Sequence, residues 1–291
     1  MSKKPCVLAL GMFDSVHIGH KKIIESCVSY AKQNGVLSVV FTFDKDVSSV
    51  INGGNGKNSS VYSPEERISV IKSLGVDEVF TASTDSAFLS KSKQEFLKYL
   101  DEFYDIKGYF CGFDYRFGNK ASGDVDFLKN YAESLGRFVC VTQEVTDGNK
   151  KVSTSDIKKL LANGKVEKVS EYLPKGYFIT GTVVKDRGVG KKLGFPTANL
   201  YPDLSKLPLK NAVYGGRVVL DKTYFAVINY GARPTFGLDK PLVEVHLIGF
   251  DGDLYGKKIT VYFDKFLREI KTFDSEEQLI EQLEKDIGEY K

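Results

Sequence analysis

The sequence predicts two domains, an α/β domain with a doubly wound parallel sheet and a small antiparallel β-barrel with a closing helix. The 291 residues suffice for two domains of roughly 100–200 residues each. Apolar runs alternate with helical patterns in the first half, which is typical of a parallel sheet. After Pro174 the chain changes to short β-rich runs broken by Gly, Pro and Asp. We therefore expect the domains to span residues 1–174 and 175–291.

The first domain is predicted from its alternation of strands and helices. Helical patterns follow each apolar run, beginning with residues 21–33 and continuing through 64–74 and 93–104. Short connections favour right-handed βαβ units, whose ligands bind at the carboxyl ends of the strands. The expected strands are residues 6–10, 36–43, 78–80, 108–111 and 137–141.

The second domain is predicted from evenly spaced β-rich runs. Ser275 and Gln278 form the pattern of a capping box, which predicts that a final helix begins there. The apolar face of that helix is Leu279, Ile280, Leu283 and Ile287. The expected strands are residues 177–184, 212–219, 223–228, 242–247 and 258–263.

Composition narrows the classes of partner and location. The net charge is only +3 and the basic residues are scattered, so no nucleic-acid partner is predicted. No long apolar segment or signal-like start occurs, so we predict a cytoplasmic protein with no membrane partner. The four cysteines lack CxxC spacing and are predicted to be buried apolar residues. Self-association is left open.

The stretch from Gly11 to His20 predicts a phosphate site. It places His17 and His20, two of the chain's three histidines, between a predicted strand and helix. Helix N-termini favour anions, Gly11 and Gly19 permit close backbone approach, and the histidines add side-chain donors. The alternatives are satisfied structural histidines or a zinc site, which two histidines without a third ligand would make poorly.

This stretch resembles the HxGH signature of the nucleotidyltransferase family, together with its GxFD prefix. The resemblance implies that His17 and His20 steady the phosphates of ATP while its α-phosphate is attacked. It also implies nucleotide contacts from Gly11, Phe13, Asp14 and Gly19.

Two further segments of the first half carry polar groups at element ends. Gly112 to Gly118 places Asp114 and Arg116 among aromatic residues after a strand, where they could hold an aromatic ligand or form only a surface ion pair. Ser153, Thr154 and Ser155 begin a helix, where capping is the default interpretation and phosphate binding the alternative.

The second half carries chemistry in two segments. A basic glycine loop from Gly188 to Gly194 leads into Thr197 and Asn199, whose spacing puts both side chains on one face of a strand, a plausible Mg²⁺ arrangement. Glu244 and His246 share a face of another strand. We expect them to face a cavity, because an inward Glu is costly unless it is functional or paired.

Taken together, these motifs resemble the bacterial bifunctional riboflavin kinase and FMN adenylyltransferase family over nearly the whole chain. Its GxFDGVHxGH, GxDFxFG, PTAN and Glu-x-His motifs all have counterparts here. The resemblance implies that riboflavin, FMN and ATP are the small-molecule substrates, FAD a product and Mg²⁺ a cofactor. It implies Glu244 as base on the flavin hydroxyl, with Thr197 and Asn199 at Mg²⁺. The implied flavin contacts are Asp114, Tyr115, Phe117 and Arg268, and the further nucleotide contacts are Ser153, Thr154, Ser155, Lys158, Gly188, Gly190, Lys191 and Gly194.

The chain departs from the family pattern at a few positions. Ser15 stands where the family usually has Gly, residues 44–47 replace Asp-Pro-His-Pro, and Lys158 replaces an Arg whose fork grips a phosphate.

The leading hypothesis is an enzyme that makes FMN and then FAD. The alternatives are a kinase whose adenylylating half is weakened, and a flavin-binding regulator without turnover.

Overall fold

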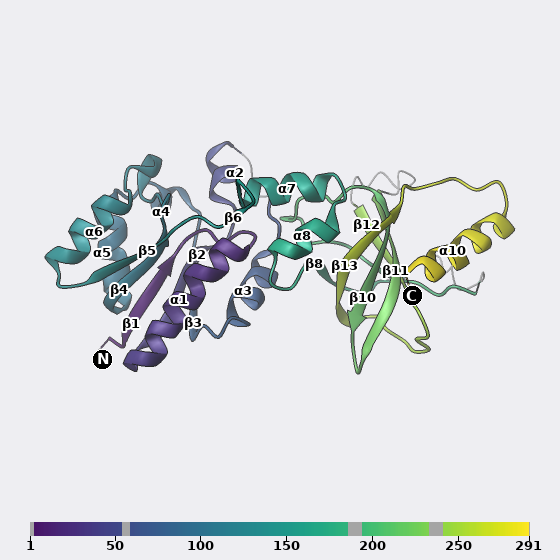
Figure 1. Cartoon of the computed structure of the whole chain (residues 1–291), viewed down its shortest axis with the longest axis horizontal. Coiled ribbons are helices and arrows are strands. Elements are labelled where there is room, and N and C mark those ends of the chain that lie inside the picture. The colour runs from purple at the N-terminus through teal and green to yellow at the C-terminus, as the bar shows by residue number, and fades with distance from the viewer. Residues whose placement is uncertain (1–2, 54–58, 186–193, 233–240, 291) are drawn as a thin grey trace. The chain divides into compact units, whose positions relative to one another are not determined.

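The computed structural model describes residues 3–53, 59–185, 194–232 and 241–290. The chain forms two compact units, Met1–Thr154 and Ser155–Lys291 (Figure 1). This division falls at the first residue of helix α7 (Thr154–Ala162) and before α8 (Val166–Tyr172), whereas the predicted domain boundary follows both helices. The boundary after residue 174 stays a prediction.

The first unit is built on a five-stranded sheet in which every pairing is parallel, as predicted. The order reverses between β1 and β4, so these two strands are the switch point of the doubly wound sheet. Ligands of such sheets bind beyond the carboxyl ends of the strands at that point. From edge to edge the strands are β3 (Glu78–Ala82), β2 (Leu37–Phe43), β1 (Pro5–Leu10), β4 (Asp105–Gly112) and β5 (Phe138–Thr142).

Helices cover both faces of this sheet, which explains why its central strands are continuous apolar runs. Leu8 and Leu10 pack in one buried cluster with residues of α5 and α6, while the alternate residues Val7 and Ala9 are also fully buried. Helix α1 packs on β1, β2 and β4 and buries Cys27 there (Figure 1). The main helices are α1 (Ile18–Asn34), α3 (Pro64–Lys72), α5 (Lys93–Phe103) and α6 (Val125–Ser134).

Several short elements of this unit were not predicted. Helix α2 (Val47–Ile51) begins because the side chain of Asp46 accepts hydrogen bonds from the N–H groups of Ser48 and Ser49. Five residues are too few to show a helical period in the sequence. The other short elements are α4 (Ser86–Leu89), the 3₁₀ turn η1 (Asn119–Ala121) and the hairpin of β6 (Thr146–Asp147) and β7 (Lys150–Lys151).

The second unit is a nearly closed antiparallel barrel, as predicted. An isolated bridge between Val184 and Asn199 brings the last strand of the order back towards the first. The interior is aromatic, since Tyr177, Tyr214 and Tyr230 all pack around the ring of Phe263. In order around the sheet the strands are β8 (Tyr177–Thr182), β13 (Lys258–Arg268), β10 (Ala212–Val219), β11 (Thr223–Ala232), β12 (Pro241–Leu247) and β9 (Ala198–Leu200).

The closing helix α10 (Glu276–Tyr290) packs on β10, β11 and β13. The Oγ of Ser275 accepts from the N–H of Gln278 at 3.4 Å, as the predicted capping box requires. The return bond is shifted by one residue, because the Gln278 side chain accepts from the N–H of Asp274. In the part of the chain that is described, no helix is long and apolar enough to cross a membrane.

Candidate functional site

His17 is the N-cap of helix α1. Its Nδ1 accepts hydrogen bonds from the backbone N–H groups of Gly19 at 3.1 Å and His20 at 3.2 Å. The helix thus begins at Ile18, earlier than predicted, and two N–H groups expected to face an anion are already capped by a side chain. An Nδ1 that accepts must be unprotonated, so the ring's proton is on Nε2. His17 offers a ligand this Nε2–H donor.

His17 and His20 form a stacked pair of neutral rings. Their centroids lie 3.8 Å apart with planes 15° from parallel, and Phe13 meets His20 edge-on. Burial, more than any charge, lowers the pKa of His17 to about 4. Burial, then the charges of His17 and Lys151, lowers the pKa of His20 as well. Both rings are therefore uncharged at neutral pH, so they offer hydrogen bonds but no positive charge to an anion.

The turn before the helix is held in an uncommon backbone conformation. Phe13 and Val16 have φ of 50° and 47°, a region that β-branched residues such as Val rarely adopt. The two glycines make room for the site's own rings: a Cβ on Gly19 would lie 2.9 Å from His17 Cε1, and one on Gly11 would lie 2.8 Å from the Phe13 ring. Such strain persists where surrounding structure enforces it, and it clusters at functional sites.

Ser15, one of the departures from the family pattern, joins this turn to the next motif. Its fully buried Oγ lies 2.9 Å from the Oγ1 of Thr154. The structure thus brings two predicted segments together by a hydroxyl pair that a glycine could not form. Of the neighbouring hydroxyls, Ser153 is half-buried and Ser155 is exposed.

Asp14 serves the turn itself. The side chain is only 4% exposed, and its Oδ1 accepts from the N–H of Val61 at 3.0 Å. The charge of Asp14 also acts on the buried guanidinium of Arg67, which donates to the carbonyl of Phe43. Burial lowers the pKa of Arg67, whereas the negative charge of Asp14 raises it. The predicted nucleotide contact from Asp14 stays a prediction, and its observed contacts position the loop before α3.

A cavity of about 200 Å³ lies against the histidines at the sheet's switch point. Six predicted site residues line it, namely His17, Gly19, His20, Asp114, Ser153 and Thr154. Lys151 also lines it, pairs with the carboxylate of Asp114 and lies 4.6 Å from the centre of the Phe113 ring. Lys151 was not among the predicted site residues, although its position two residues before Ser153 was a signal.

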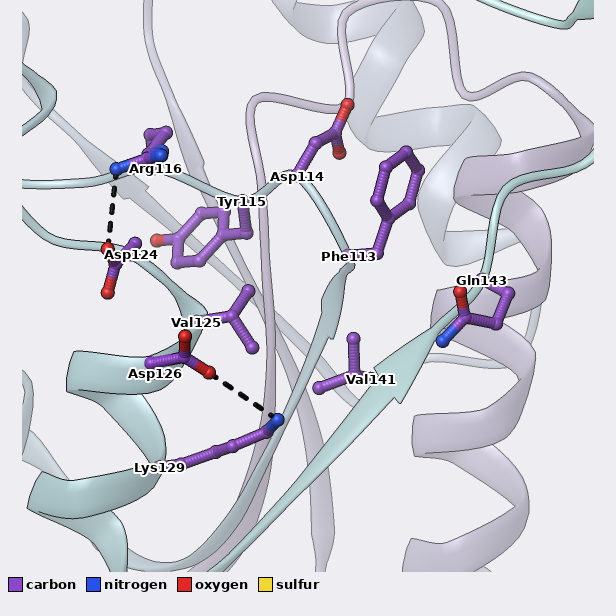
Figure 2. Close-up of a pocket in the computed structure, with 10 residues that line it drawn as sticks. All are labelled: Phe113, Asp114, Tyr115, Arg116, Asp124, Val125, Asp126, Lys129, Val141 and Gln143. Carbon is purple, nitrogen blue, oxygen red and sulfur yellow. Dashed lines mark hydrogen bonds and ion pairs between the residues drawn. The ribbon is translucent and has the colours of Figure 1, made fainter.

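A neighbouring cavity of about 390 Å³ lies beside the loop after β4 (Figure 2). Phe113, Asp114 and Tyr115 line it, and Figure 2 shows Arg116 reaching Asp124 across a 3.4 Å ion pair. Of the predicted flavin contacts, Asp114 and Tyr115 line this space. Phe117 belongs to the hydrophobic core below, where its ring stacks on that of Tyr115. Phe113, which is 41% exposed and was not predicted, is the accessible aromatic.

In the barrel, strand register aligns three polar side chains. Glu244 on β12 is directly opposite Asn199 on β9 and directly opposite Asn229 on β11. Directly opposite residues of antiparallel strands project from the same face. The Nδ2 of Asn229 donates to Glu244 Oε2 at 2.9 Å, and Asn199 is only 5% exposed. Predicted base and predicted metal ligand are therefore neighbours.

Glu244 and His246 share one face of β12, as strand alternation predicts, and the expectation that this face borders a cavity stays a prediction. Val243 is directly opposite Tyr230, whose ring packs on Phe263 in the interior, so Val243 and Val245 face the interior. Glu244 and His246 therefore lie on the opposite face, where both are half-buried. His246 packs its ring against Phe195, and its Nδ1 lies 3.0 Å from the carbonyl of Pro196. This contact holds the segment that leads into Thr197 and Asn199.

Arg268 is engaged by the closing helix. Its Nε and terminal nitrogen donate to both oxygens of Asp286, at 2.8 to 3.1 Å, and Gln282 donates to the same carboxylate. The predicted flavin contact of Arg268 stays a prediction. Lys158 is half-buried near the start of α7, and Gly194 lies in a turn with φ of 85°. The predicted nucleotide contacts Gly188, Gly190 and Lys191 fall outside the described residues.

The side-chain oxygens considered for a metal lie on β9 (Asn199) and on the residue just before it (Thr197). The described ranges contain no group of three or more His, Cys, Asp or Glu residues placed to hold a metal ion. Asn199 Oδ1, however, is buried and has no hydrogen-bond partner among the described residues, with half-buried Thr197 two residues away. Neutral oxygens beside a carboxylate suit a hard cation that keeps several waters.

Comparison with known proteins matches both halves separately. The FAD synthetase family model matches residues 1–156 and the riboflavin kinase model matches residues 173–291. Bifunctional riboflavin kinase/FMN adenylyltransferases of Buchnera aphidicola and Bacillus subtilis are 32% and 31% identical, each covering 96% of this chain and 91% and 90% of the relative. A crystal structure described as a macrolide-efflux protein from Streptococcus pneumoniae is 28% identical, with a TM-score of 0.89 over 100% of this chain and 95% of that one.

Proposed function

The chain belongs to the family of bifunctional riboflavin kinase/FMN adenylyltransferases, and on that premise we propose how its two halves divide the work. It is a transferase of FAD biosynthesis. The barrel phosphorylates riboflavin to FMN at the expense of ATP, and the α/β unit couples FMN with ATP to give FAD and pyrophosphate. The observation that carries this division is the separate match of each half to one of the two activities.

In the α/β unit, an oxygen of the FMN phosphate attacks the α-phosphorus of ATP and pyrophosphate leaves. His17 Nε2–H supports the phosphates as charge develops, because a preorganised donor costs little to reorganise. Lys151 supplies the positive charge that the neutral histidines lack. Phe113 and Tyr115 offer aromatic faces for the flavin beside the charged group of Asp114.

In the barrel, Glu244 takes the proton of the riboflavin 5′-hydroxyl as that oxygen bonds to the γ-phosphorus and ADP leaves. A carboxylate does this when it lies within hydrogen-bond reach of the hydroxyl. Asn199, the proposed Mg²⁺ ligand, is directly opposite Glu244, so the base lies beside the phosphates that the ion holds.

Thr197 and Asn199 would hold Mg²⁺, a fit supported by the buried Oδ1 of Asn199, which has no hydrogen-bond partner among the described residues. When bound, the ion neutralises charge on the nucleotide phosphates. We further propose that the enzyme acts in the cytoplasm, where ATP is available. Its four free thiols agree with a reducing compartment.

The test is a product assay. The protein is incubated with riboflavin, ATP and Mg²⁺, and riboflavin, FMN and FAD are separated over time. FMN should appear first and FAD should follow. FMN without FAD would favour a kinase whose adenylylating half is weakened, and neither product would favour a flavin-binding regulator.

A further inference from the structure

The amide of Asn229 makes a contact that the reaction chemistry leaves unexplained. We propose that Asn229 is a positioning residue for riboflavin phosphorylation, which holds the carboxylate of Glu244 in the orientation needed for proton transfer. The proposal rests on the proposed role of Glu244 as base. It adds a residue that acts through Glu244 rather than on the substrate.

The contact is enforced by the backbone. Strands β11 and β12 pair continuously from Ala226 opposite Leu247 to Ala232 opposite Pro241, with Asn229 opposite Glu244 near the middle. Because side chains alternate along a strand, a one-residue slip would move Asn229 to the other face of the sheet. The buried apolar residues beside it, Ile228 and Tyr230, fix the register by their packing in the interior.

The side-chain amide of Asn229 points its nitrogen at the carboxylate of Glu244, which leaves its own oxygen without a hydrogen bond among the described residues. Nδ2 donates to Glu244 Oε2 at 2.9 Å, and the buried Oδ1 of Asn229 has no hydrogen-bond partner in the described parts of the chain. Rotating the amide by half a turn would place Oδ1 against the carboxylate, so two acceptors would face each other. A buried acceptor without a partner is costly, and its retention indicates that the Nδ2 bond matters more.

Holding a general base in position has a measurable effect on the reaction rate. A glutamate side chain has several rotatable bonds, and a bond to a fixed neighbour confines them. Misplacing a reacting group by about 1 Å can cost roughly 10²-fold in rate. Loss of the Asn229 donor should therefore lower kcat for riboflavin phosphorylation and leave KM for ATP nearly unchanged.

The experiment uses the full chain and two substitutions. Asn229→Asp keeps the shape and removes the donor, and kcat for FMN formation should fall roughly 10- to 100-fold. Asn229→Ser restores a shorter O–H donor and should recover part of the rate. Asn163→Asp, the same change at an exposed asparagine of the barrel unit, should behave as the unchanged protein. FAD formation from added FMN should be normal in all three.

A double variant separates positioning from general damage. Because Asn229 acts only through the base, adding Asn229→Asp to Glu244→Gln should slow the reaction no further. The proposal would be overturned if the double variant were slower than Glu244→Gln alone, or if Asn229→Asp raised KM for ATP as much as it lowered kcat. It would also be overturned if Asn229→Asp lost both activities. Normal kinase turnover in Glu244→Gln would instead contradict the assignment of Glu244 as the base. If Glu244→Gln had slow kinase turnover and Asn229→Asp had normal turnover, only the positioning role of Asn229 would be contradicted.

Discussion

The two sites are assembled in opposite ways. The histidine site of the α/β unit is local: His17 caps its own helix, stacks on His20 and is accommodated by Gly19, all within four residues. The barrel site joins Asn199, Asn229 and Glu244 from three strands through register alone. A local site is visible as a sequence motif, whereas a register site depends on how distant strands pair.

The sites differ in charge as well. Burial keeps both histidines neutral, and Lys151 with Asp114 provides the charges at the rim of their cavity. The barrel site places a carboxylate between two amides. The first arrangement suits the binding of phosphates, and the second suits the removal of a proton. If this contrast is right, each site should fail separately.

The largest expected effect is at Glu244. Glu244→Gln keeps the shape and an oxygen that can accept from Asn229, but removes the base. Riboflavin phosphorylation should fall roughly 10²- to 10⁴-fold, the range for general acid–base catalysis. Steady-state kinetics should show FAD formation from FMN at its normal rate. Kinase turnover within a few fold of normal would show that Glu244 is not the base.

Substitution of His17 should impair FAD formation and leave riboflavin phosphorylation intact. His17→Asn keeps a side-chain acceptor at the N-cap and removes the Nε2–H donor, whereas His17→Ala removes both. FAD formation should fall about 10²-fold in His17→Asn, by analogy with loss of one preorganised donor, and further in His17→Ala. Riboflavin phosphorylation is the control. An equal loss of both activities in a folded variant would contradict the separation of the sites.

The sequence predicted what local pattern can encode. Buried strands such as 36–43 and the placement of His17 after a strand led to the predicted parallel sheet with a ligand site at the carboxyl ends of its strands. Alternation also placed Glu244 and His246 on one face, but it could not say which face. Leu242, on the same side as Glu244, is buried like Val243 and Val245 on the other side, so burial alone does not distinguish them.

Contacts between distant segments could not be predicted. The bond from Asn229 to Glu244 depends on strand pairing, and the Ser15–Thr154 pair spans 139 residues. Lys151 reaches Asp114 because β7 returns the chain to the loop after β4. A hairpin with only two residues in each strand leaves no periodicity in a sequence.

Acid should weaken the histidine site selectively. Burial lowers the pKa of His17 from 6.5 to about 4, so between these values the unfolded chain binds a proton that the folded chain does not. Stability from this group is present above pH 6.5 and is lost as the pH falls. By pH 5 the loss should be about 2 kcal/mol, near 30-fold in the folding equilibrium. Denaturant unfolding at pH 7 and pH 5 should show a smaller loss in His17→Asn, and equal losses in both proteins would contradict this account.

Lys151 tests whether the cavity rim carries the charge. Lys151→Met should weaken adenylylation about tenfold in kcat/KM for ATP, the scale of one charge-assisted hydrogen bond. Lys150→Met, the adjacent exposed lysine on β7, is the matched control and should have little effect. Equal defects in the two variants would mean that the net charge of the hairpin matters and the position of Lys151 does not.

Substitutions of Ser15 should have the smallest effect. They test whether the histidine site, which is otherwise local, also depends on a contact with a distant residue. Ser15→Gly restores the residue usual in the family but removes the hydroxyl pair with Thr154. A buried hydrogen bond contributes roughly 1 kcal/mol, so FAD formation should fall about fivefold. Ser15→Ala, which keeps the Cβ and loses only the hydroxyl, should show the same loss. If Ser15→Gly were as fast as the unchanged enzyme while Ser15→Ala was slow, the Cβ would be the obstacle and the hydroxyl only its compensation. If both were unchanged, the histidine turn would hold its geometry without Thr154.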